Sequence, residues 1–195
     1  MDAAFQYDQY LLLKQVFAFT GKLRIYNPQS QLVLYCQQKF FRLKEDIRIY
    51  SDETKSHELL NIQARNVIDF SAYYDVFDSL YTTKIGGLRR KGLRSFVQDE
   101  WEVFDAYENL IGVLKEDTLN QALLRRLFFG RFLPQNYDLI LGDERVADYR
   151  QHRKLIGYEL DINFQMDVNK LLDHRLGLAA AVLLAIIEGR QRKEG

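Results

Sequence analysis

The chain has 195 residues, of which 47% are hydrophobic and 28% charged, and its 27 basic side chains balance 27 acidic ones. This neutrality excludes the globally basic composition of a dedicated nucleic-acid binder. The one cysteine, Cys36, excludes an intrachain disulfide framework and a multi-cysteine zinc site. The length is typical of one domain, or at most two small ones, with a sizeable core.

The first eight residues contain no basic segment followed by a long apolar run, so we predict no secretory signal and a cytoplasmic location. Most of the remaining chain reads as strands, because aromatic and β-branched residues alternate with polar ones. The clearest strand is Tyr158–Met166, in which Leu160, Ile162 and Phe164 are predicted to face a core. Shorter strands are predicted at Lys22–Tyr26, Gln31–Cys36, Asp46–Tyr50, Ser71–Phe77, Trp101–Phe104 and Tyr137–Leu141.

The turns between these strands share one pattern, in which an apolar strand end is followed by Asn, Asp or Ser and then by another apolar strand. Asn27 and Asp105 are the clearest examples, and their side chains are predicted to hydrogen-bond within their own turns. A further tight hairpin is predicted at 141–146. Successive hairpins predict an antiparallel sheet, and many antiparallel strands hide their edges by closing into a barrel or pairing as a sandwich.

Two segments have helical rather than strand periodicity. The first is predicted over Thr118–Gly130, where a capping-box pattern precedes leucines at helical spacing. The second is predicted to begin after Asp167 and to run to about Arg190, and its stretch Leu176–Ile187 has no charged residue. A helix of this apolar length rises about 18 Å, which is too short for the roughly 30 Å hydrocarbon layer of a membrane. We therefore predict a buried helix around which the sheet is wrapped.

The most prominent polar segment contains five cations and no acid, namely Lys84, Arg89, Arg90, Lys91 and Arg94. One interpretation is a ligand-binding patch for a lipid head group or phosphate, since each cation near an anionic membrane contributes about 1 kcal/mol. The alternative is charge balance, because the acids of residues 99–108 lie within reach across a hairpin. Gly86 and Gly87 are predicted to be turn or bulge residues, since the Lys-Ser/Thr pair of a phosphate-binding P-loop does not follow Gly92.

The remaining candidate residues are interpreted as structural. His174 stands at the start of the predicted buried helix, where a hydrogen-bonding role is favoured over a metal-binding one. Cys36 shares a strand face with Leu32 and Leu34, which is typical of a small buried hydrophobic residue rather than a nucleophile. We therefore predict no catalytic residue, no metal site and no cofactor.

Three segments carry a resemblance to a known family: KIGGLRRKGLRS (84–95), DEWEVFD (99–105) and LDHRLGLAAA (172–181), the last followed by EGRQ (188–191). They resemble bacterial members of the LURP-one-related group, which belongs with the Tubby C-terminal domain and the phospholipid scramblases. The resemblance covers about residues 10–191, so it implies a single domain over 1–195 with short flexible termini. It implies a mainly β fold, a closed antiparallel barrel of about twelve strands that encloses a hydrophobic C-terminal helix.

The same resemblance implies binding rather than catalysis, because Tubby domains bind phosphoinositide head groups through basic side chains on the barrel surface. We therefore expect a non-catalytic binding module, with anionic phospholipid or phosphoinositide head groups as the ligand of the basic segment. The alternatives are a scramblase-like lipid-handling protein and a scaffold for a protein partner. On the first expectation the protein is cytoplasmic and peripheral at the membrane, and nucleic acid is not a partner.

Overall fold

The computed structural model describes residues 1–15, 20–39, 46–66, 72–91, 100–116, 135–152 and 157–191. These residues form a short 3-10 helix η1 (Ala3–Phe5), twelve strands and helix α2 (His174–Gln191). The strands are β1 (Gln9–Gln15), β2 (Thr20–Tyr26), β3 (Leu32–Lys39), β4 (Ile47–Tyr50), β5 (Glu58–Asn66), β6 (Tyr73–Asp78), β7 (Thr83–Arg90), β8 (Glu100–Asp105), β9 (Leu110–Glu116), β10 (Asn136–Leu141), β11 (Glu144–His152) and β12 (Tyr158–Asn163). The predicted helix over 118–130 lies outside the described residues.

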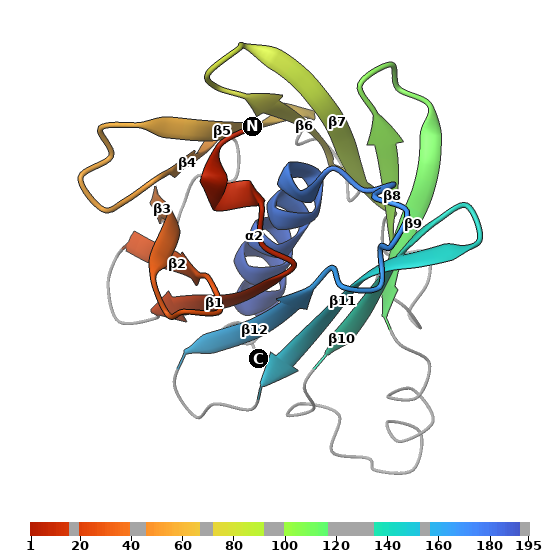
Figure 1. Cartoon of the computed structure of the whole chain (residues 1–195). Coiled ribbons are helices and arrows are strands. Elements are labelled where there is room, and N and C mark those ends of the chain that lie inside the picture. Colours follow the sequence, from red (N-terminus) through yellow and green to blue (C-terminus); the bar gives the residue numbers. More distant parts are fainter. Residues whose placement is uncertain are drawn as a thin grey trace.

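The strands form one closed antiparallel barrel (Figure 1). Each strand pairs with the next one along the chain, and β1 pairs with β12 to close the ring, with Leu12 opposite Leu160. Closure removes the exposed sheet edges that would otherwise pair with other chains. The predicted fold class, a twelve-stranded barrel around a C-terminal helix, is confirmed.

The predicted facing of β12 is confirmed, although the strand is shorter than expected. Leu160, Ile162 and Phe164 are at most 1% exposed. Pairing stops at Asn163, whose side-chain oxygen accepts a hydrogen bond from the backbone N–H of Gln165 at 2.9 Å. Alternation therefore persists for one residue beyond the strand, because Phe164 still points into the core after the ladder has ended.

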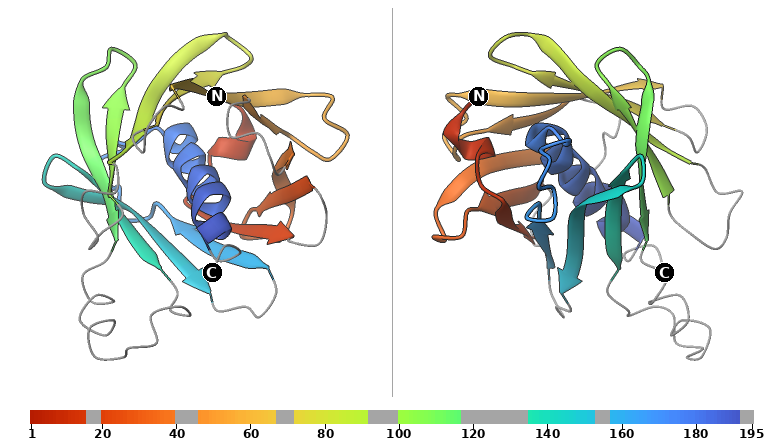
Figure 2. Two further views of the ribbon diagram at one scale, coloured as in Figure 1. Left: turned by 180° about the vertical axis from the view of Figure 1, so that it is seen from behind. Right: turned by 45° about the vertical axis from the view of Figure 1, so that its right-hand side comes forward.

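Helix α2 lies inside the ring of strands in every view (Figures 1 and 2). Every apolar side chain from Leu176 to Ile186 is at most 3% exposed, which confirms the predicted buried helix. The predicted start after Asp167 is wrong, because the helix begins at His174. Asp167 instead holds a turn, in which its carboxylate accepts hydrogen bonds from the backbone N–H groups of Leu171 and Leu172.

Two polar side chains of the barrel wall hold the backbone of α2 and are not predicted from the sequence. The hydroxyl of Tyr149 donates to the carbonyl oxygen of Gly177 at 3.0 Å, and the ammonium of Lys14 donates to that of Ala185 at 2.6 Å. Burial raises the pKa of Tyr149, so its hydroxyl keeps its proton. These bonds satisfy polar groups that would be costly to bury alone.

The predicted turn roles of Asn27 and Asp105 are confirmed. Oδ1 of Asn27 accepts the backbone N–H of Gln31 at 2.9 Å, and Oδ1 of Asp105 accepts that of Asn109 at 2.9 Å. Because all neighbouring strands are antiparallel, every turn that follows an even-numbered strand lies at the same end of the barrel. Helix α2 also begins there, and we call this end the helix-start end; it comprises residues 1–8, 27–31, 51–57, 79–82, 106–109, 142–143 and 164–173.

Candidate functional site

The structure divides the predicted basic cluster between the two ends of one strand. Lys84 lies beside the β6–β7 turn at the helix-start end, whereas Arg89 and Arg90 complete β7 and Lys91 follows. At about 3.3 Å per residue, Lys84 and Lys91 are roughly 20 Å apart along the strand. Arg94 lies outside the described residues. The described cations therefore do not form one patch.

Arg89 and Lys91 face carboxylates of β8. Nη2 of Arg89 is 2.5 Å from a carboxylate oxygen of Glu102, and the ammonium of Lys91 contacts Glu100 and lies 3.7 Å from Glu102. Hydrogen bonding to Glu100 raises the pKa of Lys91. The predicted charge balance is thus confirmed at these two positions, whose side chains remain 45% and 49% exposed.

Gly86 and Gly87 lie within β7, so their predicted placement in a turn is wrong. A bulge does occur beside them, because the β6–β7 register shifts and leaves Ile85 as the extra residue. A Cβ added to Gly86 would come within 2.5 Å of the carbonyl oxygen of Phe104. Glycine therefore serves here to let β7 approach its neighbours closely.

Lys84 belongs to a polar network on the barrel surface that joins β5, β6 and β7 to the β8–β9 turn. Its Nζ lies 2.8 Å from Asp75 and 2.9 Å from Glu108. Arg65 contacts the same two carboxylates and stacks over the ring of Tyr73, 4.3 Å from its centroid. Arg65, and after it Lys84, hold the pKa of Glu108 at about 2. The charge of Lys84 is therefore balanced by two carboxylates, and its side chain is only 18% exposed.

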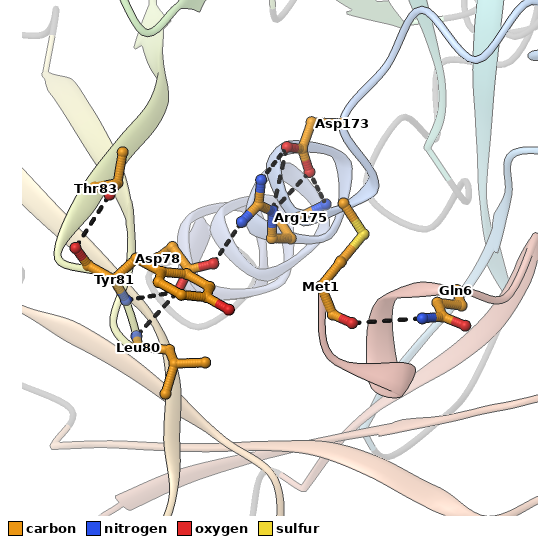
Figure 3. A network of polar contacts seen from close by, with 8 residues as sticks. All are labelled: Met1, Gln6, Asp78, Leu80, Tyr81, Thr83, Asp173 and Arg175. Atoms are coloured by element: carbon orange, nitrogen blue, oxygen red, sulfur yellow. Dashed lines mark hydrogen bonds and ion pairs between the residues drawn. The ribbon is translucent and has the colours of Figure 1, made fainter.

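Lys84 also lines a cavity of about 290 Å³ between the β6–β7 hairpin and the start of α2. The other lining residues are Asp78, Tyr81, Thr83, Ile85, Asp173 and Arg175. Figure 3 shows the guanidinium of Arg175 between the carboxylates of Asp78 and Asp173. The bond to Asp78 connects the helix to a hairpin residue 97 positions away in the sequence. The cavity offers charged groups of both signs and one phenol, which suits binding of a polar side chain or small polar molecule.

Local sequence explains how the two acids of this cavity are held. Oδ1 of Asp78 accepts the backbone N–H groups of Leu80 and Tyr81 at 2.9 and 3.2 Å, which shapes the turn. Asp173 precedes α2, and its Oδ1 accepts the N–H of Arg175 at 2.9 Å as a helix cap does. The pairing of Asp78 with Arg175 is not predicted from the sequence, because no local pattern relates residues so far apart.

His174 and Cys36 have the structural roles predicted for them. Nδ1 of His174 is 3.2 Å from the carbonyl oxygen of Phe5, and its ring stacks on Phe164 at a centroid distance of 4.4 Å. Cys36 is 2% exposed, and burial raises the pKa of its thiol to about 12. A thiol that keeps its proton at neutral pH is a poor nucleophile.

The described part of the chain holds no group of three or more His, Cys, Asp or Glu side chains with the arrangement of a metal site. Among its helices, none has the length and apolar character needed to cross a membrane.

Comparison with known proteins identifies the family. A sequence profile described as LURP-one-related matches residues 10–185, which is most of the chain. A protein from Arabidopsis thaliana, solved by X-ray crystallography, has a similar structure with a TM-score of 0.54 and 12% sequence identity. The similarity covers 98% of this chain and 97% of the plant protein, and at this identity it shows a shared fold alone. The comparison with curated proteins gave no match. The family profile matches residues 10–185, which include all of the barrel strands except the first residue of β1, and most of the C-terminal helix. This chain therefore belongs to the LURP-one-related family.

Proposed function

We propose that this protein is a non-catalytic binding scaffold whose ligand contacts the outside of the barrel. The observation that supports this most directly is the burial of α2, whose apolar side chains from Leu176 to Ile186 are at most 3% exposed. In barrels that carry a small ligand, the ligand occupies the interior. Here the helix occupies that space, so ligand contacts are left to the outer face and the barrel ends.

Anionic phospholipid head groups, phosphoinositides included, are the ligand class that we propose for the far end of β7. Arg89, Arg90 and Lys91 follow one another in the chain there, and the side chains of Arg89 and Lys91, two residues apart, are about half exposed. Exposed ion pairs such as those with Glu100 and Glu102 contribute only about 0–1 kcal/mol each. A phosphate group that approaches several cations at once can therefore replace a carboxylate partner.

We further infer a relationship to Tubby C-terminal domains and a peripheral location on the cytoplasmic face of a membrane. Support comes from the resemblance of the 84–95 segment to bacterial LURP-one-related sequences and from the barrel that encloses a helix. A scramblase-like activity is less favoured, because α2 would have to leave the barrel and expose its buried leucines to act within a bilayer.

The test is co-sedimentation of the full chain with neutral vesicles, phosphatidylserine vesicles and phosphoinositide vesicles, at low salt and at about 0.15 M salt. We expect binding to anionic vesicles at low salt that weakens as salt rises, since charges beyond about 8 Å are screened at 0.15 M. The triple variant Arg89→Ala, Arg90→Ala, Lys91→Ala should lose this binding. Competition by soluble inositol phosphate then separates head-group recognition from general attraction to a membrane.

A second triple variant provides the matched control, because it removes three cations elsewhere: Arg48→Ala, Arg145→Ala and Lys170→Ala. These side chains are 53%, 44% and 64% exposed and belong to β4, β11 and the segment before α2, none of which pairs with β7. The control should bind vesicles as the unmodified protein does. Equal loss in both triple variants, or no binding at low salt, would contradict lipid recognition by β7 and leave its cations as partners of β8.

A further inference from the structure

Seven large hydrophobic side chains are exposed at the helix-start end of the barrel. They are Met1, Leu80, Tyr81, Tyr107, Leu110, Val168 and Leu171, with exposed fractions between 49% and 87%. They belong to the N-terminal segment, the β6–β7 turn, the β8–β9 turn with Leu110 at the start of β9, and the segment before α2. All of these segments are at the helix-start end. Single exposed hydrophobic residues are ordinary, but seven of them on the turns and segments of one barrel end provide apolar area for an interaction surface.

Polar contacts tie these segments into one surface. Arg175 at the start of α2 bonds Asp78 next to the β6–β7 turn, and Lys84 beyond that turn bonds Glu108 of the β8–β9 turn. The segment before α2 is joined to the N-terminal residues by the ion pair of Lys170 with Asp8 at 2.9 Å. Figure 3 shows Met1 and Tyr81 near Arg175, with Leu80 next to Tyr81. Tyr81 and Arg175 both line the cavity of about 290 Å³. Of the seven exposed hydrophobic side chains, Tyr81 lines this polar cavity.

This end carries more acids than bases, although the whole chain has 27 charges of each sign. The residues of the helix-start end include two bases, Lys55 and Lys170, and eight acids: Asp2, Asp8, Asp52, Glu53, Glu108, Asp143, Asp167 and Asp173. Three of these acids, Glu53, Glu108 and Asp173, pair with Arg24, Lys84 and Arg175 from just outside these segments, which leaves acids in excess. An anionic membrane is repelled by such a surface, and a second copy would present the same negative charge. A positively charged partner is attracted.

We propose that the helix-start end is a docking surface for a basic, amphipathic segment of a partner protein. Apolar side chains of the partner pack on Leu80, Tyr81 and Leu171, while its Lys or Arg side chains face the surrounding acids. The cavity beside Tyr81 is near the lower limit of small-molecule pockets, so its volume suits one side chain of the partner.

The polar groups around the cavity favour a cation from the partner. Four carboxylates, those of Asp75, Asp78, Glu108 and Asp173, form ion pairs with three cations, those of Arg65, Lys84 and Arg175. The cluster therefore has one negative charge in excess. A Lys or Arg from the partner balances this charge, and its apolar stem covers Tyr81. This site lies at the opposite end of β7 from the proposed lipid contact and does not depend on it.

The probe is a fluorescent helical peptide of leucine and lysine with an apolar face and a basic face, titrated with the full chain and followed by anisotropy. Its counterpart carries glutamate in place of every lysine. We expect the lysine peptide to bind and the glutamate peptide not to bind. The double variant Tyr81→Ser, Leu171→Ser should weaken binding by about tenfold, since exposed aromatic and leucine anchors dominate such contacts. The Arg89→Ala, Arg90→Ala, Lys91→Ala variant should bind the peptide unchanged.

Three results would overturn the proposal. The first is equal peptide binding by the double variant and the unmodified protein, and the second is equal binding of the two peptides. The third is that the double variant loses a different interaction of the unmodified protein. A loss of self-association in analytical ultracentrifugation would assign this end to a second copy, and a loss of vesicle binding would assign it to a membrane. Failure of vesicle binding in the β7 variant alone bears only on the proposed lipid contact.

Discussion

The backbone of Gly87 in β7 lies directly against the phenol of Tyr73 in β6. A Cβ added to Gly87 would come within 2.2 Å of the Tyr73 hydroxyl oxygen and 2.6 Å of its ring carbon. The ring cannot easily move away, because it also contacts Phe104 at a centroid distance of 5.2 Å and carries the guanidinium of Arg65. The glycine thus allows an aromatic ring to lie flat on the outer face of the barrel.

We expect Gly87→Ala to destabilise the protein by about 1–3 kcal/mol, as overpacking of a filled site does. The free energy of unfolding from denaturant titration measures this cost. Gly142→Asn is the matched control, because Gly142 has a φ of 56° and nothing within 4 Å of an added Cβ, and asparagine tolerates such a φ. A Gly87→Ala protein as stable as the control would show that Tyr73 does not depend on the glycine.

Helix α2 should not accept a charge on any of its described apolar positions. Ala181 is 0% exposed, so Ala181→Arg places an uncompensated cation in the core and should prevent folding. Leu183→Ala at 1% exposure should leave the fold intact and cost about 2–5 kcal/mol. Circular dichroism and size-exclusion chromatography distinguish the outcomes. An Ala181→Arg protein that melts cooperatively at the temperature of the unmodified chain would mean that α2 is not enclosed.

Neighbouring residues of β12 should differ sharply in their effect on stability. Ile162 is 1% exposed and faces the core, so Ile162→Ala should cost about 2–5 kcal/mol. Asp161 points outward, its side chain 51% exposed beside His152, so Asp161→Ala should cost under about 1 kcal/mol. Denaturant unfolding of both variants provides the measurement. Similar costs at the two positions would show that the facing of the strand is misassigned.

The network around Glu108 should make stability depend on pH in the acid range. Hydrogen bonds from Arg65 and Lys84 lower the pKa of Glu108 from 4.5 to about 2 in the folded protein. A carboxyl whose pKa is lower when folded stabilises the fold above its unfolded pKa, and this stabilisation is lost as pH falls through the folded pKa. Glu108 therefore contributes stability above about pH 4.5 that disappears towards pH 2.

Glu108→Gln tests this expectation through the melting temperature measured across that pH range. The variant should melt below the unmodified protein at neutral pH, and the difference should shrink as the pH falls. Asp143→Asn removes another turn carboxylate and is the control for loss of charge alone. A constant difference between Glu108→Gln and the unmodified protein at every pH would contradict a role for the ionised carboxylate.

The sequence predicts those features of the barrel that depend on whether a single side chain is buried or on a turn within a few residues. Period-two alternation identifies the inward residues of β12, and an uncharged apolar stretch identifies the enclosed α2. Asn27 and Asp105 are predicted because an Asx turn is made within five residues of chain. In these cases the determining interactions are local, or depend only on whether a side chain faces water.

The candidate site is less predictable, because its contacts depend on which strands lie side by side. In the sequence, the segment from Lys84 to Lys91 is read as one basic patch. Because most of it forms the extended strand β7, Lys84 lies at one end of the barrel and Lys91 at the other. The exact start of α2 escapes prediction because a turn held by Asp167 can precede a helix without changing the hydrophobic pattern.

By itself, the sequence determined that the chain forms hairpins and buries a helix, since alternation and apolar length express how each segment meets water. Only the tertiary structure decided that Asp78 meets Arg175 across 97 residues, and that Met1, Tyr81, Tyr107 and Leu171 share one end of the barrel. Closing a ring of antiparallel strands brings every second turn to the same end, whatever the distance along the chain. This geometry, rather than any local motif, assembles the surface on which the proposed protein partner docks.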